Sequence, residues 1–345
     1  MPLEPDPPVP AVPRMHRQSI VEVLARYGLA LAGEPVPIAA SVLNQNYMVG
    51  TVAGRRFIRF HRKSRTRERL ETEQDVIHAA AGRGIPAIAA ISDGGGRWLH
   101  SLSNQFISVY PWIEGETLRR GAIGPGAART LGDLHGRLHA TLRDYSHPKL
   151  PTSGTGTWWD REESIEVLGR VDDLIRYYPS STPEQLRIQD AIRRQMDWLQ
   201  TNEARPANEF AGLRRQCCHG DYHERNVIMD AAGGVAAVVD WEITGMIPPV
   251  FEVLRALSFM ELWAPELSGP YLTAYRTHAT LEDCEAGVEM WWQAQLHSTW
   301  VYRARFIEGT RAAGQFLEPH DRLLTALRDP AYRRTLASTL ATPSR

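Results

Sequence analysis

The residues most able to do chemistry are two carboxylates and one amide: Asp221 and Asn226 in the run HGDYHERN (residues 219–226), and Asp240. Residues prone to form strands flank a Gly-Gly turn at 233–234, which predicts a hairpin. A hairpin with short arms brings Asn226 and Asp240 to the same end, and Asp221 on the entering loop can reach that place. Such hard oxygen ligands suit Mg²⁺ that bridges phosphates better than they suit zinc. One of the two carboxylates is then left over to accept a proton.

Each of these three residues alone is more often a helix cap, a turn residue or a polar end to a strand. The three together, at this spacing across one hairpin, favour a functional site. Its position in the molecule depends on the elements on either side.

The elements before residue 110 predict a small half of mixed helix and strand. Apolar residues recur at helical spacing over 20–30, and the phrase 66–81 predicts a second helix. Strands are expected along the rest of this half, at 36–40, 46–52, 56–60, 87–91 and 105–110. The turn Ala53-Gly54 between two of them is typical of an antiparallel hairpin.

The second half of the chain is mainly helical. Helices are expected at 127–142, 164–177 and 183–201 and again from residue 249 to the end, while strand-forming residues return only at 216–242. The Pro-rich residues 1–14 lack the pattern of a signal peptide and are expected to form a mobile tail. We therefore expect an N-terminal lobe at 15–109 and a C-terminal lobe at 110–345.

The composition is that of an ordinary globular protein. The 345 residues are 43% hydrophobic and 23% charged, and the formal net charge of −1 argues against nucleic acid as a partner. Three cysteines without disulfide spacing fit a reducing compartment, so a cytoplasmic location is expected. No apolar run approaches the roughly 20 residues of a membrane helix. The oligomeric state is left open.

Three sequence motifs follow one another in the chain: HGDYHERN, then VVDWE, then GMIPPVFEVLRAL. In this order and spacing they resemble the aminoglycoside phosphotransferase and choline-kinase-like small-molecule kinases, relatives of the protein kinases. The resemblance implies an α+β, bilobed, protein-kinase-like fold with an antiparallel sheet in the small lobe. It also implies transfer of the γ-phosphate of ATP or GTP to a hydroxyl of a small-molecule acceptor.

The resemblance assigns roles to individual residues of the catalytic segment. Asp221 is implied to be the catalytic base, or to orient the acceptor hydroxyl, while Asn226 and Asp240 hold Mg²⁺. Glu242 and Glu252 are implied to be supporting residues, although carboxylates at a helix start are common without such a role.

The first half resembles the homoserine-kinase-like branch of the same family. This likeness implies that the loop 41–46 covers the nucleotide phosphates, and that backbone groups at the lobe junction meet the base. The residues concerned are Ser41, Asn44 and Asn46 in the loop and Val109, Tyr110 and Trp112 at the junction. The loop contains no glycine, which weakens this signal because close backbone approach to phosphate is easiest with glycine.

An arginine stands where these kinases commonly carry a phosphate-binding lysine. Arg59 occupies that strand position, and the only lysines of the chain are Lys63 and Lys149. Arginine can bind phosphate through its fork, and alternation along the strand points it opposite to its apolar neighbours. Its expected partner on the next helix is Glu73, with Glu71 and Asp75 as competitors.

The acceptor is not determined by these residues. An antibiotic would make the protein a resistance kinase, while homoserine or an amino alcohol would make it a metabolite kinase. Residues 253–345 carry equal numbers of acids and arginines, without the acidic excess expected for a polycationic aminoglycoside. The missing lysine also allows a pseudokinase that only binds nucleotide.

Two further patterns favour packing over chemistry. His135 and His139 have the i, i+4 spacing of zinc ligands, but the phrase HGRLH lacks the Glu of HExxH and suggests no third ligand. Aromatic residues on the C-terminal helices could line a pocket but more often form core: Trp291, Trp292, Trp300, Tyr302 and Phe306.

Overall fold

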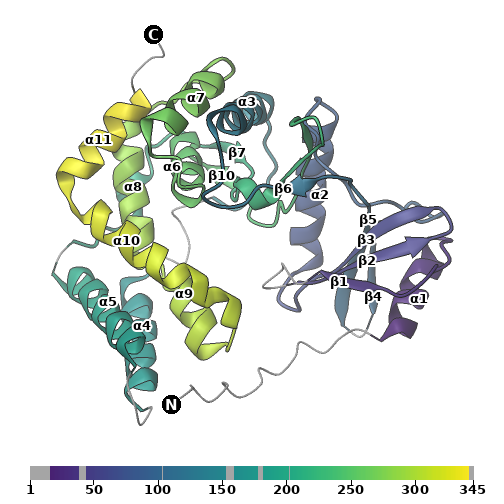
Figure 1. Ribbon diagram of the computed structural model, residues 1–345, viewed down its shortest axis with the longest axis horizontal. Helices are drawn as coiled ribbons and strands as arrows, with labels where there is room; N and C mark the ends of the chain where they lie inside the picture. Colours follow the sequence, from purple (N-terminus) through teal and green to yellow (C-terminus); the bar gives the residue numbers. More distant parts are fainter. Residues whose placement is uncertain are drawn as a thin grey trace.

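The computed structural model consists of a small sheet-containing lobe and a larger helical lobe (Figure 1). The expected bilobed α+β arrangement is therefore observed. The expected tail 1–14 and the predicted phosphate-binding residue Ser41 lie outside the described residues, which are 16–38, 44–102, 104–152, 159–177, 182–201 and 203–341.

The small lobe is built on a five-stranded antiparallel sheet with the order β1-β2-β3-β5-β4. Helix α1 (Arg17–Arg26) packs its apolar residues against one face, where Ile58 and Phe60 are fully buried. Because side chains alternate along a strand, Arg59 points to the other face. The strands are β1 (Val36–Ile38), β2 (Gln45–Thr51), β3 (Gly54–Phe60), β4 (Leu99–Leu102) and β5 (Gln105–Pro111).

The prediction of a strand at 87–91 is wrong. This stretch makes only an isolated bridge, between Ala87 and Val238 of the other lobe, and the N–H of Ile91 donates to the carbonyl of Val109 at 2.8 Å. The fourth strand is instead β4, which pairs with β5 in antiparallel register. The run 87–91 consists of three alanines and two isoleucines after a proline. Only the isoleucines favour a strand, because alanine is depleted in strands, and the run lacks the alternation of a half-buried strand.

Helix α2 (Arg67–Ala81) lies between the sheet and the large lobe (Figure 1). It begins at Thr66, whose hydroxyl accepts a hydrogen bond from the N–H of Arg69 at 3.2 Å, the usual N-cap arrangement. It ends before Gly84, which has a φ of +85° that favours glycine.

The large lobe surrounds two small sheets with helices. One sheet has the order β6-β8-β9, and β7 pairs with β10 in the other. The strands are β6 (Glu116–Thr117), β7 (Gln216–Cys218), β8 (Val227–Met229), β9 (Val235–Val238) and β10 (Gly245–Ile247). The helices are α3 (Pro125–Leu142), α4 (Arg161–Arg176), α5 (Pro183–Gln200), α6 (Pro249–Phe259), α7 (Pro265–Arg276), α8 (Cys284–His297), α9 (Trp300–Tyr302), α10 (Leu317–Arg328) and α11 (Pro330–Ala341).

The aromatic residues of the C-terminal helices mostly form core. Trp291, Trp292 and Tyr302 are buried, and Trp291 packs edge-on against Phe251 of α6. Phe306 is partly buried against the same core, and Trp300 is the most exposed of the five, with 42% of its surface exposed.

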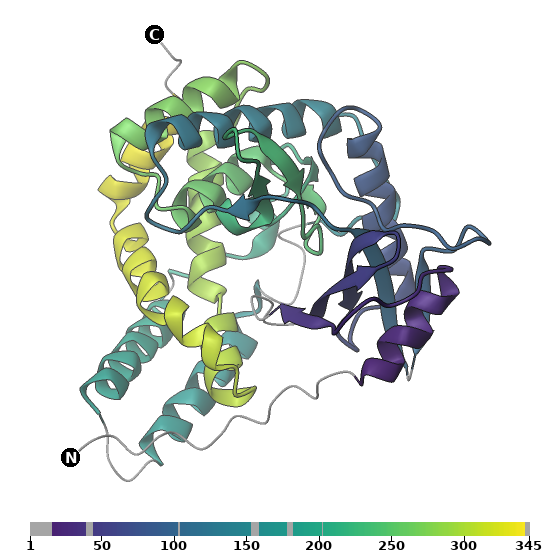
Figure 2. The same cartoon turned by 45° about the vertical axis from the view of Figure 1, so that its right-hand side comes forward.

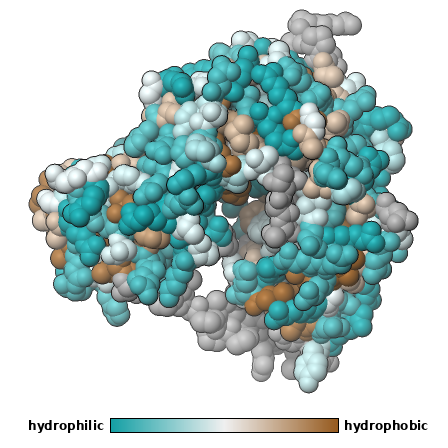
Figure 3. Space-filling model, turned by 180° about the vertical axis from the view of Figure 1, so that it is seen from behind, coloured by the Kyte–Doolittle hydropathy of each residue, from teal (hydrophilic) through white to brown (hydrophobic). Residues whose placement is uncertain are grey.

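The two lobes meet along the side on which α2 and α3 come together (Figure 2). From behind, the surface is mostly hydrophilic, and a notch separates the smaller lobe from the larger one (Figure 3). Among the described residues, no helix is long and apolar enough to cross a membrane.

Helices α3 and α7 approach each other unusually closely. Two glycines of α3, Gly132 and Gly136, face the backbone of Tyr271 and Tyr275 on α7, and a Cβ on either glycine would overlap that backbone. The glycines are therefore required by the contact between the helices, despite the conformational cost of glycine in a helix.

We expect Gly136→Ala to lower the free energy of unfolding by about 1–3 kcal/mol, because the added methyl group forces α3 and α7 apart. The matched control is Gly126→Ala in the first turn of α3, where a Cβ meets no atom within 4 Å. That change should leave stability unaltered or raise it by up to about 1 kcal/mol. Urea unfolding of both variants measures the difference, and equal effects would contradict this account of the glycines.

Candidate active site

The hairpin predicted from the sequence is present and brings Asn226 and Asp240 together. Val227 of β8 pairs with Val238 of β9, and the N–H of Val239 donates to the carbonyl of Asn226 at 2.9 Å. Asn226 and Asp240 therefore lie at the same end of the hairpin. Asp240 has a φ of +65°, a left-handed conformation that Asp tolerates better than most residues.

Asp221 lies beside Asn226, as the spacing predicted. The Nδ2 amide of Asn226 donates to the Asp221 carbonyl at 2.8 Å and lies 3.3 Å from Oδ2 of its carboxylate. The amide oxygen of Asn226 is consequently turned away from Asp221. The amide oxygen of Asn226 and the carboxylate of Asp240 thus lie at one end of the hairpin. Mg²⁺ binds oxygen ligands of this kind, so the two residues are suited to hold it.

An arginine that the sequence analysis missed holds Asp221. Arg255 of α6 donates to Oδ1 of Asp221 from Nε at 3.1 Å and from Nη2 at 2.5 Å. Burial alone would raise the pKa of Asp221, but the Arg255 guanidinium and His223 outweigh it and hold the pKa well below its usual range. Asp221 is therefore an anion at neutral pH.

Two histidines of the catalytic segment bond to its backbone and side chains. His219 donates from Nε2 to the carbonyl of Val239 at 3.0 Å, while its Nδ1 accepts from the N–H of Asp221 at 3.2 Å. These bonds fit a neutral ring, and burial lowers the pKa of His219. Burial would also lower the pKa of His223, but hydrogen bonds with Asp221 and Glu224 raise it to about 9.

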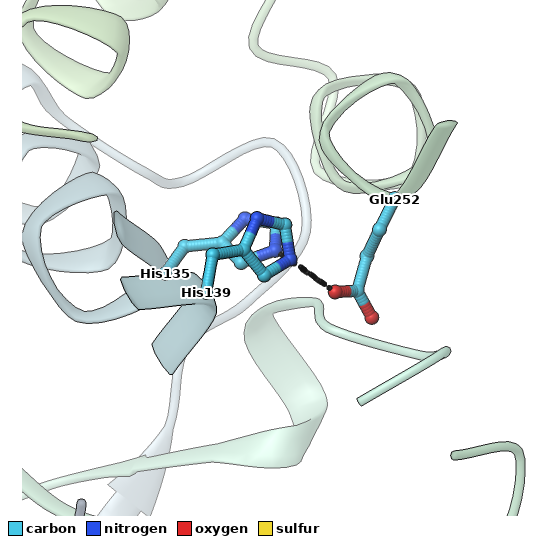
Figure 4. Close-up of side chains that lie close together, drawn as sticks. All are labelled: His135, His139 and Glu252. Atoms are coloured by element: carbon cyan, nitrogen blue, oxygen red, sulfur yellow. Dashed lines mark hydrogen bonds and ion pairs between the residues drawn. The ribbon is translucent and has the colours of Figure 1, made fainter. Parts of the chain in front are cut away.

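Beneath the catalytic segment, His135 and His139 of α3 converge on Glu252 of α6 (Figure 4). Their Nε2 atoms lie 3.3 and 2.6 Å from the same carboxylate oxygen. The other oxygen of Glu252 accepts the backbone N–H of Gly220. All three side chains are buried, so this carboxylate fixes the position of the loop that carries Asp221 relative to α3 and α6.

The sequence suggested no third ligand beside the two histidines, but the structure places Glu252 there. The remaining ring nitrogens are also engaged: Nδ1 of His135 with the Tyr271 hydroxyl at 2.5 Å and Nδ1 of His139 with the Tyr275 hydroxyl at 2.7 Å. Because every nitrogen already has a partner, the cluster is satisfied as a hydrogen-bond network and leaves no nitrogen free for a metal.

Arg59 crosses the gap between the lobes to meet Asp240. Its Nη1 donates to Oδ1 of Asp240 at 3.0 Å, and only 11% of the arginine side chain is exposed. Burial would lower the pKa of Arg59, but Asp240 and the acids around it raise it, so the guanidinium stays charged.

The expected ion pair between Arg59 and Glu73 is not the one observed. Glu73 pairs instead with Arg65, which precedes α2, and both side chains are almost fully buried. Desolvation raises the pKa of Glu73 to about 7 despite this partner. Arg59 is drawn to Asp240 because the hairpin end lies opposite its strand, a contact between lobes that strand periodicity does not reveal.

Further arginines bind the segment after Asp240. Arg65 and Arg69 donate to the backbone carbonyl of Glu242 at 3.1 and 3.2 Å. The Glu242 carboxylate lies 2.7 Å from Nη2 of Arg62 and accepts a hydrogen bond from Nδ2 of Asn44 at 3.1 Å. The predicted phosphate-loop residue Asn44 therefore contacts the large lobe, and Glu242 joins the two lobes.

The remaining predicted nucleotide-binding residues lie in or beside the sheet. Asn46 of β2 pairs with Arg59 of β3, and its buried side-chain oxygen has no hydrogen-bond partner among the described residues. The side chain of Tyr110 is buried within the small lobe. Trp112 follows β5 at the lobe junction, where its buried Nε1 has no partner among the described residues. The carbonyl of Val109 already accepts the N–H of Ile91.

Comparison with known proteins finds a family whose sequence model matches most of the chain. The model of the "Phosphotransferase enzyme family" matches residues 34–287. A comparison with curated proteins gives no match.

Three solved structures illustrate the likeness of fold. An amicoumacin kinase in complex with AMP-PNP, Ca²⁺ and Ami is 16% identical, with a TM-score of 0.62 over 90% of this chain and 94% of that one. A spectinomycin phosphotransferase with ADP and spectinomycin is 16% identical, with a TM-score of 0.63 over 95% and 100%. A microcompartment-associated aminopropanol kinase is 15% identical, with a TM-score of 0.60 over 94% and 99%. They confirm the fold expected from the sequence.

We expect the destabilisation caused by His135→Asn to shrink as the pH falls from about 6.5 towards 4. Burial lowers the pKa of His135 to about 4, so in this range the unfolded chain of the wild type binds a proton that the folded state does not. The wild type therefore loses up to about 1.4 kcal/mol per pH unit through this residue, and the variant does not. Urea unfolding at pH 7, 6 and 5 tests this, and a constant difference would contradict it.

Proposed function

Because the chain belongs to the phosphotransferase enzyme family, we propose that it is a small-molecule kinase that moves the γ-phosphate of ATP onto a hydroxyl in a magnesium-dependent reaction. The observation that carries the proposal is the gathering of Asp221, Asn226 and Asp240 at one hairpin end, facing Arg59 of the other lobe. The nucleotide lies between the lobes. Complexes of the neighbours with AMP-PNP and ADP support ATP over GTP as the donor.

In this proposal Asn226 and Asp240 hold Mg²⁺, which offsets the negative charge of the phosphates. Arg59 exchanges its bond to Asp240 for the phosphates of the nucleotide. Asn44 and Asn46, with Ser41 from outside the described residues, cover the phosphates, and Glu73 supports the arginines on the same side. Val109, Tyr110 and Trp112 border the base.

Asp221 orients the acceptor hydroxyl. The hydroxyl oxygen forms the new bond to the γ-phosphorus, the bond from that phosphorus to the bridging oxygen breaks, and ADP leaves with the electron pair. The hydroxyl proton hydrogen-bonds to Asp221, whose charge is fixed by Arg255, and it passes to this carboxylate late in the step, once bonding to phosphorus has made the hydroxyl acidic. Because the pKa of this carboxyl is held low, Asp221 is a weak base, and its main contribution is to align the attacking oxygen.

The neighbours suggest two classes of acceptor. Spectinomycin and amicoumacin are antibiotics, which supports the assignment of a resistance kinase, while the aminopropanol kinase supports a metabolite kinase that acts on an amino alcohol or homoserine. A pseudokinase is the third possibility. ADP formation with purified protein across antibiotics and hydroxylated metabolites separates the three.

We expect Asp240→Asn to reduce the gain in nucleotide affinity that Mg²⁺ provides by roughly tenfold or more, because a charged ligand is lost. The matched control is Asp230→Asn at the turn, at the opposite end of the same hairpin. Calorimetric titration with ATP, with and without Mg²⁺, gives the comparison. Unchanged metal dependence in Asp240→Asn would remove Asp240 from the metal site.

We expect Asp221→Asn to lower kcat by about 10²–10⁴-fold while nucleotide affinity stays close to that of the wild type. The amide cannot hold the hydroxyl as the carboxylate does, but the nucleotide contacts lie on Asn226, Asp240 and Arg59. Steady-state kinetics and calorimetry test the two halves separately. A variant that keeps more than about a tenth of wild-type turnover, with chemistry rate-limiting, would end the catalytic assignment.

A further inference from the structure

The carboxylate of Asp221 is bordered by Arg255. Nε and Nη2 of Arg255 are bonded to Oδ1, and Nη1 has no hydrogen-bond partner among the described residues. About a quarter of this side chain is exposed, at 24%. Any acceptor with its hydroxyl at Asp221 therefore has its neighbouring groups close to a guanidinium.

Two more basic side chains share one aromatic ring with Arg255. The ring of Phe259 lies at the C-terminal end of α6, and the Arg255 guanidinium is 4.5 Å from its centroid. The guanidinium of Arg120, on the segment after β6, is 5.9 Å from the same ring. The His223 ring stacks on it with a centroid separation of 6.2 Å. Three separate segments thus place basic groups around Phe259, and two of these groups, Arg255 and His223, contact Asp221 directly.

Acids do not balance this charge. Asp221 is matched by Arg255, and Glu261 is shared between Arg120 and Arg322, each 3.7 Å away. Three guanidinium groups thus face two carboxylates, and His223 adds no excess charge because Glu224 lies 3.6 Å from its Nδ1. In addition, Nε of Arg120 is buried and makes no hydrogen bond in the described part of the chain. A cationic acceptor would meet like charge here, whereas an anionic group would be paired.

We propose that the acceptor carries an anionic group, a carboxylate or a phosphate, close to the hydroxyl that receives the γ-phosphate, and that Arg255 and Arg120 bind this group. The inference rests on the proposed kinase function and narrows its substrate class. It sets this chain apart from a kinase whose acceptor is a positively charged amino alcohol, and it disfavours polycationic aminoglycosides. Guanidinium forks bind carboxylate and phosphate alike, so both anions belong to the class.

The direct test is a screen of matched triplets. Each hydroxylated compound is offered as its free acid, its neutral amide and its amine, and a phosphate monoester of the same alcohol distinguishes the two anions. ADP formation is measured with ATP and Mg²⁺. We expect the acids or phosphate esters to have at least tenfold higher kcat/KM than the matched amines. A best acceptor that is an amine, or equal rates across triplets, would overturn the inference.

Two variants separate binding of the anion from positioning of Asp221. The acid that Arg120 pairs with is Glu261 and not Asp221, so Arg120→Gln should raise KM for the anionic acceptor roughly tenfold and leave kcat and the KM of the neutral amide unchanged. Arg255→Gln should raise the same KM and also lower kcat. The control is Arg119→Gln, the same change in the neighbouring exposed residue, which should alter neither constant. An Arg120→Gln enzyme with unaltered KM for the anion would contradict the inference.

A binding measurement keeps the inference testable if no compound is phosphorylated. Thermal unfolding of the protein with Mg²⁺ and ADP is followed in the presence of the same acids, amides and amines. Stabilisation by acids that Arg120→Gln abolishes supports the anion site even where the kinase proposal fails. Stabilisation by amines, or by no member of the set, overturns the anion site, while ADP formation reports on the kinase function separately.

Discussion

The position of the loop that carries Asp221 depends on the buried carboxylate of Glu252. A lone charge in the protein interior costs several kcal/mol, so a carboxylate at this depth persists only where donors surround it. Here the donors come from two parts of the chain: the imidazoles of His135 and His139 on α3 and the backbone N–H of Gly220. Helix α6, helix α3 and the loop that carries Asp221 can therefore occupy only one mutual arrangement.

Gly220 shows how strict this arrangement is. Its φ is +88°, and a Cβ there would overlap the backbone carbonyl of Ile243. The glycine therefore allows two things at once: the backbone conformation that points its N–H at Glu252, and the close passage of the segment after Asp240. Gly220 of the HGD motif is therefore required by the backbone conformation and by the close packing against Ile243.

The polar contacts between the lobes are made largely by arginines, whose guanidinium groups offer several donors where lysine would offer a single point of charge. Arg59 reaches a side chain of the large lobe, whereas Arg65 and Arg69 reach backbone carbonyls. These last two bonds tie the start of α2 to the loop after the hairpin. The orientation of α2 is thus set by these contacts with the backbone, together with the burial of its apolar residues Val76, Ile77 and Ala80 in the core of the large lobe.

The sequence was most informative where distance along the chain is short. The hairpin and the shared end of Asn226 and Asp240 were predictable because turn chemistry and strand alternation act over a few residues. The helices of the large lobe were predictable for the same reason. The role of Asp221 rests on a family resemblance and stays a prediction.

Partner choice between distant residues was not predictable. Arg255 faces Asp221, and Glu73 faces Arg65 instead of Arg59, because packing of whole elements brings these groups together. Spacing could show that acids and arginines occur on each element, but not which would meet. The incorrect prediction of a strand at 87–91 has a different cause: its two isoleucines suit an extended segment without a pairing strand, while its three alanines disfavour a strand.

The close contact between α3 and α7 has a consequence for how such a sequence can change. Glycines at 132 and 136, histidines at 135 and 139 and tyrosines at 271 and 275 all repeat at four residues, so one helical face matches the other. Deleting a single residue from either helix rotates the remainder of that helix by about 100° and separates both tyrosine–histidine pairs together. Divergence at these six positions should therefore be concerted, with exchanges inherited as sets, so that covariation among homologues would trace the interface of the two helices.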